Sequence, residues 1–375
     1  MPSDVAPVPM GLNALSSLLV GPVAAAGPAV RSREHGAWYA PPTPFGSDVR
    51  ALAAALSGYG LSEGARAAVL GSDGCGTLQA GLAVIAAGGT LVPLDPALSD
   101  DALRRALLSS GVVQAIATDE RQLARILALR PELSTLELVL LISANPSERK
   151  PAAMLVATAI EVGAASLAAD PGQLRSADAA AETTAACVLF DASGQARMVG
   201  RAELNVLADA FAKVLGQAKG KTVLSSLPVG GAERLGVALA SLSQGATLLL
   251  ADPFERPDAG LDTYPADALL IDLTALERLF RAWMEDIDAK SWLGRSATRW
   301  ALRQGRAAPR GGWKHRLADR IALGGLREKI GGRATSLNVV AHGGRRASDE
   351  IESFFPAAGV TLHYLAPDTM TVLAR

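Results

Sequence analysis

Short apolar runs alternate with longer amphipathic segments along most of the chain. The runs hold four to seven mostly apolar residues, as in AAVL at 67–70 and LELVLLI at 136–142. Between them, apolar residues recur at helical spacing, as in DVRALAAALSGY at 48–59, where Asp48 is expected to cap the helix and Gly60 to end it. Buried strands that alternate with helices of about ten residues are typical of βαβ units on a parallel sheet. The pattern therefore predicts an α/β fold.

The same spacing predicts the remaining elements. The expected strands are 67–70, 90–93, 115–118, 136–142, 185–190, 222–227, 247–251, 268–272, 336–341 and 361–364. The expected helices are 12–20, 48–59, 77–87, 100–110, 122–129, 152–159, 202–215, 233–243, 274–287 and 348–357.

Weak periodicity separates two series of such elements. Residues 143–182 are rich in Ala, Pro and Asp and are expected to form an irregular link. The chain then divides into an N-terminal segment at 1–46, a first α/β subdomain with the link at 47–182, and a second α/β subdomain at 183–375.

Composition narrows the class of protein. With 49% hydrophobic residues among 375, the chain is not intrinsically disordered. The 36 basic residues nearly balance the 37 acidic ones and only 4% are aromatic, so a nucleic-acid partner is not expected. No apolar run reaches the roughly 18 residues of a membrane span, and no Lys or Arg precedes the apolar patch at 12–26 as a signal peptide would require. Two cysteines, Cys75 and Cys187, cannot form a disulfide framework, and a cytoplasmic protein without transmembrane segments is expected.

One segment, 288–333, departs from this balance and is expected to be a helical insertion. From Lys290 to Arg333 it holds twelve Lys or Arg against two acidic residues, with three tryptophans among them. The favoured interpretation is a pair of solvated amphipathic helices whose tryptophans pack on the body. The other hypothesis is a basic surface for an acidic partner, a phosphopantetheine carrier or a membrane face.

Several segments occur in a characteristic order: VRALAAALSGYGLSEGARAAVLG (49–71), GLAVIAAGGTLVPLDPALSDDALRRALLSSG (81–111), LPVGGAERLGVALASLSQGATLLLADP (227–253), VVAHGGRRASDEIESFFPAAGV (339–360) and HYLAPDTMTV (363–372). This order resembles the adenylate-forming (AMP-binding) enzymes, and among them the long-chain acyl-CoA synthetases. The resemblance implies the N-terminal domain of that fold, with two subdomains of parallel sheets flanked by helices. Family members continue with a ribose-binding Asp, a hinge and a small C-terminal domain that carries a catalytic Lys. This chain stops at Arg375, so we expect a truncated form that lacks that domain.

The phosphate-binding loop of the family is altered here. Family members carry a Ser/Thr/Gly-rich loop that ends in Pro-Lys-Gly and cradles the phosphates of ATP. After the strand ACVLF, this chain has DASGQARMVG at 191–200, in which Ser193 and Gly194 are the only matching pair. The Lys and the paired Thr are missing, and Asp191 adds a negative charge that Arg197 could offset. An ordinary strand–helix loop is therefore favoured over a working phosphate site.

A second family motif is partly kept. The resemblance places Tyr364 where a tyrosine packs on adenine, Asp368 where an acidic residue helps to hold Mg²⁺, and Thr369 where a threonine follows. Leu365 and Pro367 replace a Gly and a Thr of the motif. The alternative is a strand end with one core tyrosine. His342, Gly343 and Gly344 match a Ser-Gly-Gly-type turn of the family. The resulting candidates for a nucleotide-binding remnant are Ser193, Gly194, Gly343, Gly344, Tyr364, Asp368 and Thr369, with Asp368 as the candidate Mg²⁺ ligand. No residue is assigned a catalytic role.

Three functional hypotheses follow from this resemblance with altered motifs. The first is a degenerate long-chain fatty-acid-CoA ligase homologue without full ligase activity, which acts as a binding or assembly partner in acyl or lipid metabolism. The second is an active ATP-dependent acyl-CoA ligase whose missing parts are supplied in trans. The third is a carrier of an apolar acyl ligand. Mg²⁺ and ATP or AMP are expected as cofactors only if activity remains.

The partner is expected at the C-terminal face. We predict that the strand at 361–364 and the apolar helix face of Ile351, Phe354 and Phe355 are partly uncovered and form an interface for a homodimer or a second protein. The alternative is that residues 370–375 fold back over this face. An acyl group or an acyl carrier is a further candidate ligand.

Overall fold

A computed structural model describes most of the chain. The described residues are 30–34, 37–41, 43–71, 74–142, 153–174, 184–190, 194–228, 230–251, 261, 264–307 and 336–367. The expected helix at 12–20 lies outside them.

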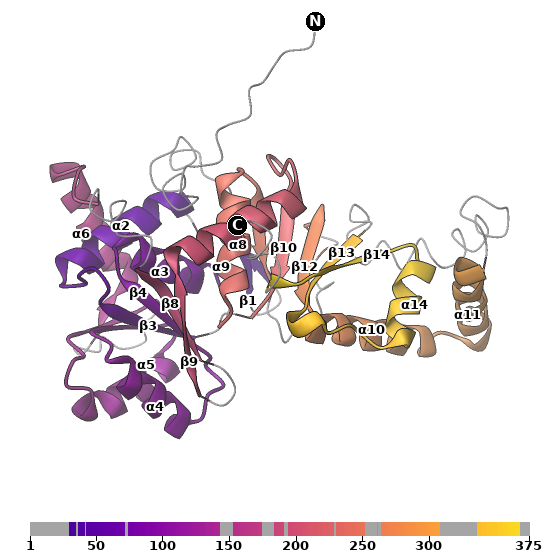
Figure 1. Cartoon of the computed structure of the whole chain (residues 1–375), viewed down its shortest axis with the longest axis horizontal. Coiled ribbons are helices and arrows are strands. Elements are labelled where there is room, and N and C mark those ends of the chain that lie inside the picture. The colour runs from indigo at the N-terminus through magenta and orange to yellow at the C-terminus, as the bar shows by residue number, and fades with distance from the viewer. Residues whose placement is uncertain are drawn as a thin grey trace, which may run out of the picture.

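Fourteen described strands form two seven-stranded sheets (Figure 1). The strands are β1 Val30–Glu34, β2 Ala37–Tyr39, β3 Arg66–Leu70, β4 Thr90–Leu94, β5 Gln114–Ala117, β6 Leu138–Leu141, β7 Met154–Leu155, β8 Ala185–Phe190, β9 Ala196–Gly200, β10 Thr222–Ser226, β11 Thr247–Leu250, β12 Ala268–Asp272, β13 Ser336–Val340 and β14 Thr361–Leu365. Sheet I has the order β7-β6-β5-β3-β4-β8-β9, and sheet II has the order β14-β13-β12-β10-β11-β1-β2. Both are parallel except for one antiparallel edge strand each, β9 and β2. The predicted α/β fold is confirmed.

Helices cover both faces of each sheet and fill the space between them. They are α2 Phe45–Gly58, α3 Cys75–Ala86, α4 Asp100–Ser110, α5 Glu120–Leu129, α6 Val156–Ala169, α8 Arg201–Leu215, α9 Ala232–Ser243, α10 Leu273–Asp288, α11 Trp292–Ala307 and α14 Asp349–Ala357. The central core joins apolar residues of α2, α3, α6, α8 and α9 to the facing sides of the two sheets. A second core packs α4 and α5 on the outer face of sheet I, and a third packs α10, α11 and α14 on the outer face of sheet II. The fold is therefore a stack of three helix layers separated by two sheets.

Local signals explain several helix ends. Ser99 caps α4 by accepting a hydrogen bond from the Ala102 N–H at 3.3 Å, and Gly111 ends that helix in the left-handed conformation at φ +59°. Gly60 has φ +94°, as expected after α2. The prediction for Asp48 was wrong. Helix α2 begins at Phe45 after Pro44, and Asp48 lies in its first turn, where it accepts a hydrogen bond from the Thr43 hydroxyl.

The sequence division at 182/183 does not coincide with the boundary between the sheets. Strand β8, expected to open the second subdomain, pairs with β4 in sheet I, with Cys187 opposite Leu91. Its hairpin partner β9 lies in the stretch expected to be a loop, and β1, in the N-terminal segment, pairs with β11 in sheet II. These strands carry no local signal of which distant strand they will join.

The prediction that the C-terminal helix face is uncovered was also wrong. Ile351, Phe354 and Phe355 are all buried. The Phe354 ring lies 5.0 Å from that of Phe280, and the Phe355 ring 5.5 Å from that of Trp283 (centroid distances). Helix α10 supplies both partners because it packs on the same face of sheet II as α14, so the apolar face is covered within the chain.

The basic segment is only partly described. Its first helix is α11, and residues 308–335, which include Trp313, lie outside the described part. Trp300 is half-buried and packs against the core of sheet II, as expected. Trp292, in contrast, is 73% exposed, so the expectation that it packs on the body was wrong.

No helix in the described ranges is both long enough and apolar enough to cross a bilayer. Both cysteines are buried, and they do not form a disulfide with each other.

Candidate functional site

The candidate site lies where β13 and β14 end at the edge of sheet II. These strands are parallel neighbours, with Val339 opposite Tyr364. Directly after β13, residues His342–Gly344 form a single 3₁₀ turn. Ligand sites of open α/β sheets lie outside the carboxyl ends of the strands, and this turn is at such an end.

The two glycines of this turn are required by its backbone. Gly343 has φ +62° and Gly344 φ +68°, values that side-chain-bearing residues rarely adopt. A Cβ added at either position would meet no atom within 4 Å, so space is open above the turn. His342 at its start lies near α9, with its Nε2 3.6 Å from Oε1 of Glu233 in the first turn of that helix.

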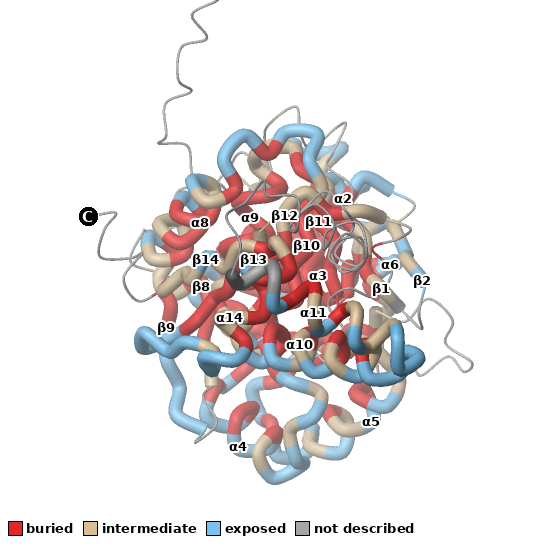
Figure 2. Tube along the Cα trace, turned by 90° about the vertical axis from the view of Figure 1, so that its right-hand side faces the viewer, coloured by how far each residue is buried: buried red, intermediate tan, exposed pale blue. Residues whose placement is uncertain are grey.

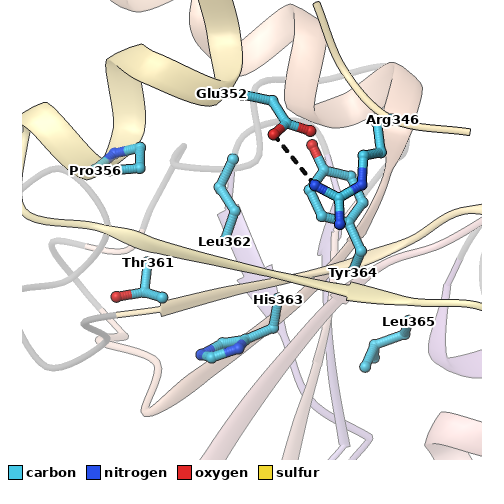
Figure 3. Close-up of a pocket in the computed structure, with 8 residues that line it drawn as sticks. All are labelled: Arg346, Glu352, Pro356, Thr361, Leu362, His363, Tyr364 and Leu365. Atoms are coloured by element: carbon cyan, nitrogen blue, oxygen red, sulfur yellow. Dashed lines mark hydrogen bonds and ion pairs between the residues drawn. The ribbon is translucent and has the colours of Figure 1, made fainter. Parts of the chain in front are cut away.

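Tyr364 is surrounded by polar groups of this chain (Figure 3). Its hydroxyl accepts a hydrogen bond from the Ala347 N–H at 3.3 Å. The guanidinium carbon of Arg346 lies 5.1 Å from the centre of its ring, a cation–π contact. Arg346 is held in turn by Glu352 of α14, with Nη1 and Oε2 3.5 Å apart. One arginine therefore joins the turn after β13 to both β14 and α14.

The environment also changes the ionisation of Tyr364. Burial raises the pKa of its phenol, the hydrogen bond from Ala347 lowers it, and the nearby Glu352 carboxylate raises it again, for a net rise. The phenol therefore stays protonated at neutral pH and keeps a proton to donate toward the carboxylate.

A pocket of about 450 Å³ opens beside these residues, along the outer edge of β14. It is lined by Arg346, Glu352, Pro356, Thr361, Leu362, His363, Tyr364 and Leu365. Five of the eight are consecutive residues of the edge strand, and Figure 3 shows α14 on one side of them.

The altered phosphate loop belongs to the other sheet. It connects β8 to β9 in an antiparallel hairpin of sheet I. Gly194 lies there at φ +80° with open space around it, while Ser193 and Asp191 lie outside the described residues. Arg197, considered above as a counter-charge for Asp191, forms an exposed ion pair with Glu203 of α8. Burial raises the pKa of the neighbouring Cys187 thiol to about 12, with help from Glu203, so this thiol stays protonated at neutral pH.

The structure thus brings together three of the predicted residues, Gly343, Gly344 and Tyr364, and places Gly194 on the other sheet. Asp368 and Thr369 lie outside the described residues, so the predicted Mg²⁺ ligand stays a prediction. In the described part of the chain, no group of three or more His, Cys, Asp and Glu side chains is arranged to hold a metal ion. Sequence reasoning missed the contacts of Arg346 and Glu352, because nothing in their spacing shows that both meet Tyr364.

Residues 45–363 match a family model described as AMP-binding enzyme. No curated protein matches the chain. Among solved structures, the chain is similar to a long-chain-fatty-acid-CoA ligase from Archaeoglobus fulgidus, with 12% identity, a TM-score of 0.64 and 95% of this chain covered. It is likewise similar to the adenylation and carrier didomain of a carboxylic acid reductase from Segniliparus rugosus in complex with AMP (14% identity, TM-score 0.64, 95% covered).

A third similar structure, from Rhodopseudomonas palustris, is described as a long-chain-fatty-acid CoA ligase, with 13% identity, a TM-score of 0.60 and 89% of this chain covered. The chain spans 63%, 52% and 70% of the lengths of these three proteins, respectively. At such identities the similarity establishes the fold, and it agrees with the two-sheet architecture described above.

Proposed function

Since the chain belongs to the AMP-binding enzyme family, we propose that it is a degenerate homologue of the fatty-acid-CoA ligases that has lost most or all ligase activity. It acts instead as a binding or assembly partner in acyl or lipid metabolism. The fold alone does not establish this role, because one fold supports many activities.

The observation that carries the proposal is the contact between Arg346 and Tyr364. By resemblance, Tyr364 is the residue whose ring packs on adenine, yet the Arg346 guanidinium lies over that ring and is held by Glu352. A base that stacks on this face of the ring must first displace a paired arginine. The remaining aromatic surface is therefore a poorer platform than a free ring.

The loop between β8 and β9 supports the same conclusion. The stretch DASGQARMVG at 191–200 contains neither Lys nor Thr, and its one cation, Arg197, is paired with Glu203. Removing one positioned charge stabiliser typically costs about 2.7–4 kcal/mol of transition-state stabilisation, or about 100- to 1,000-fold in rate. A loop that lacks several such groups is expected to support little adenylate formation.

Purified protein is therefore expected to catalyse no ATP–pyrophosphate exchange above background with Mg²⁺ and a long-chain fatty acid. The exchange assay reports the adenylation half-reaction alone, so it does not depend on CoA or on a later step. A complete fatty-acid-CoA ligase serves as the positive control. Exchange that persists through repurification and is lost in the Asp368→Ala variant would contradict the proposal.

Nucleotide binding is expected to be weak, with a Kd for ATP above about 1 mM, or a binding free energy weaker than about −4.1 kcal/mol. Arg346→Ala should uncover the Tyr364 ring and increase the affinity for adenosine about two- to fivefold, the equivalent of an exposed cation–π contact. Adenosine is the probe because it carries no phosphate for Arg346 to attract. Arg345→Ala removes the same charge one residue away and should leave adenosine affinity unchanged. NMR titration measures the adenosine affinity of both variants and the ATP affinity of the wild type. A micromolar Kd of the wild type for ATP would refute the expectation of weak nucleotide binding.

An active ligase is the second candidate, and the family match over residues 45–363 favours it. In this case the missing groups are supplied in trans. Exchange activity that appears only when a second protein is added would support this candidate over the first.

The proposed protein partner meets this chain at the edge of sheet II rather than at the buried face of α14. Strand β14 is the last strand of that sheet in the described part of the chain, and an open edge can pair with a strand of a second protein. The homodimer or second protein therefore stays a proposal, and its contact surface is the open edge of β14 in place of the α14 face.

A further inference from the structure

Two adjacent apolar side chains protrude from the start of α11. Trp292 is 73% exposed and Leu293 is 70% exposed, the largest values among the exposed large hydrophobic residues of the described chain. The next largest, Met198 at 62%, is a single side chain on β9 of the other sheet. Exposed apolar residues that occur singly are ordinary, whereas a contiguous pair of large ones points to a contact surface.

The pair belongs to an amphipathic helix. Thr298, Ala301 and Leu302 are buried on the inner side of α11. Trp292, Arg299 and Arg303 are all exposed, and at spacings of seven and eleven residues they share the outer side of the helix. In Figure 2, α11 lies on the face of the molecule nearest the viewer, and Figure 1 places it at one end of the long axis. The helix therefore presents an apolar tip and a cationic stripe away from the body.

The charge along α11 itself has one sign. Helix α11 holds four Arg and no Asp or Glu, although Glu285, Asp286 and Asp288 at the end of α10 precede it. Within the described part, Arg299 pairs with Asp288 at 2.9 Å, but both side chains are about half exposed, and such a surface pair contributes little. Arg303 has no acidic neighbour within its own helix. The outer side of α11 thus complements an anionic surface, although the whole chain is nearly neutral.

We propose that α11 docks this protein on an anionic phospholipid surface, with Trp292 and Leu293 in the interfacial layer and the arginines beside the lipid phosphates. Tryptophan is enriched at membrane interfaces, and amphipathic helices with basic polar faces bind anionic lipid. A lipid surface needs only a protruding apolar tip flanked by cations. A stable protein interface instead needs about 800 Å² of complementary surface on each partner. This docking goes beyond the proposed function and stands independently of it.

The test is flotation of the full chain with vesicles of phosphatidylcholine alone or with one quarter phosphatidylglycerol. We expect binding only to the anionic vesicles and a steep decrease in binding as the salt concentration rises. The double variant Trp292→Ser/Leu293→Ser should weaken binding on the order of a hundredfold, because burying each of these side chains is worth about a factor of ten. Arg299→Gln/Arg303→Gln should weaken binding to anionic vesicles as well.

Met198→Ser is the matched control, since it removes the next most exposed large apolar side chain, which lies on the other sheet, and it should leave binding unchanged. All these positions are exposed, so each variant should keep the wild-type circular dichroism spectrum. Absence of binding, equal binding to both vesicle types, or full binding by the Trp292/Leu293 variant would overturn the proposal. Binding to poly-glutamate without binding to vesicles would also overturn it and would identify an acidic protein as the partner instead.

Discussion

Replacing Phe354 with aspartate is expected to unfold the half of the molecule that is built on sheet II. Phe354 is buried, and its ring lies 5.0 Å from that of Phe280, 6.1 Å from that of Trp283 and 5.4 Å from that of Phe355 (centroid distances). These rings join α14 to α10 over the outer face of the sheet. A carboxylate at this position would be shielded from water among these aromatic rings.

The expected loss exceeds what a domain can tolerate. Truncating a buried phenylalanine costs about 3–5 kcal/mol, and an unpaired buried carboxylate adds several kcal/mol more. Domains are stable by about 5–15 kcal/mol in total. Tryptophan fluorescence can follow chemical denaturation of this core, because buried Trp283 lies in it. The unfolding transition of this half should be lost or shifted far toward zero denaturant.

Phe354→Leu is the matched variant, because it keeps the position apolar and should retain a cooperative transition with a smaller loss. A Phe354→Asp protein that keeps wild-type stability and differs only in assembly would contradict this expectation. That outcome would restore the interface that the sequence predicted for this helix face.

Replacing Gly163 with alanine is expected to separate two helices that touch through their backbones. A Cβ at Gly163 of α6 would lie 1.8 Å from the carbonyl oxygen of Ala51 in α2 and 2.7 Å from its carbonyl carbon. Neither atom is the movable end of a side chain, so one helix has to shift. The expected cost is about 3 kcal/mol or more, at the upper end of the cost of overpacking.

Gly58→Ala provides the control with the identical chemical change. Gly58 is the exposed last residue of α2, and a Cβ there would meet no atom within 4 Å. Alanine favours the helix over glycine by up to about 1 kcal/mol, so this variant should be neutral or slightly more stable. Urea denaturation of both variants measures whether each substitution lowers or raises the free energy of unfolding. Equal stability of Gly163→Ala and the wild type would show that the helices do not approach so closely.

Much of the local structure follows from the sequence alone. The strand expected at 90–93 is β4 at Thr90–Leu94, and the helix expected at 100–110 is α4 with the same bounds. Both could be predicted because burial selects the residues of each element: all five residues of β4 are buried, as in a core strand of a parallel sheet, whereas α4 buries one side only and repeats its apolar residues at helical spacing. Glycines that require a positive φ, such as Gly60 and Gly111, likewise mark their helix ends within a few residues of sequence.

The resemblance to the adenylate-forming enzymes could also be detected from the sequence, because it depends on the order of many segments. The family match over residues 45–363 confirms it. Of the predicted site, the sequence could indicate Gly343, Gly344 and Tyr364 through this order. It could not indicate Arg346 over the Tyr364 ring or Glu352 behind it, because these contacts join a turn, a helix and a strand.

Only the tertiary structure decided which elements are partners. The alternation of strands and helices is the same whether β8 pairs in sheet I or sheet II, and the apolar stripe of α14 is the same whether α10 or a second protein covers it. Local periodicity records that a side chain is buried, not which distant surface buries it. The pairing of Cys187 with Leu91 and the packing of Phe354 on Phe280 depend on the simultaneous fit of all the layers. The exposure of Trp292 was decided in the same way, because its own helix has an inner side that three other residues already occupy.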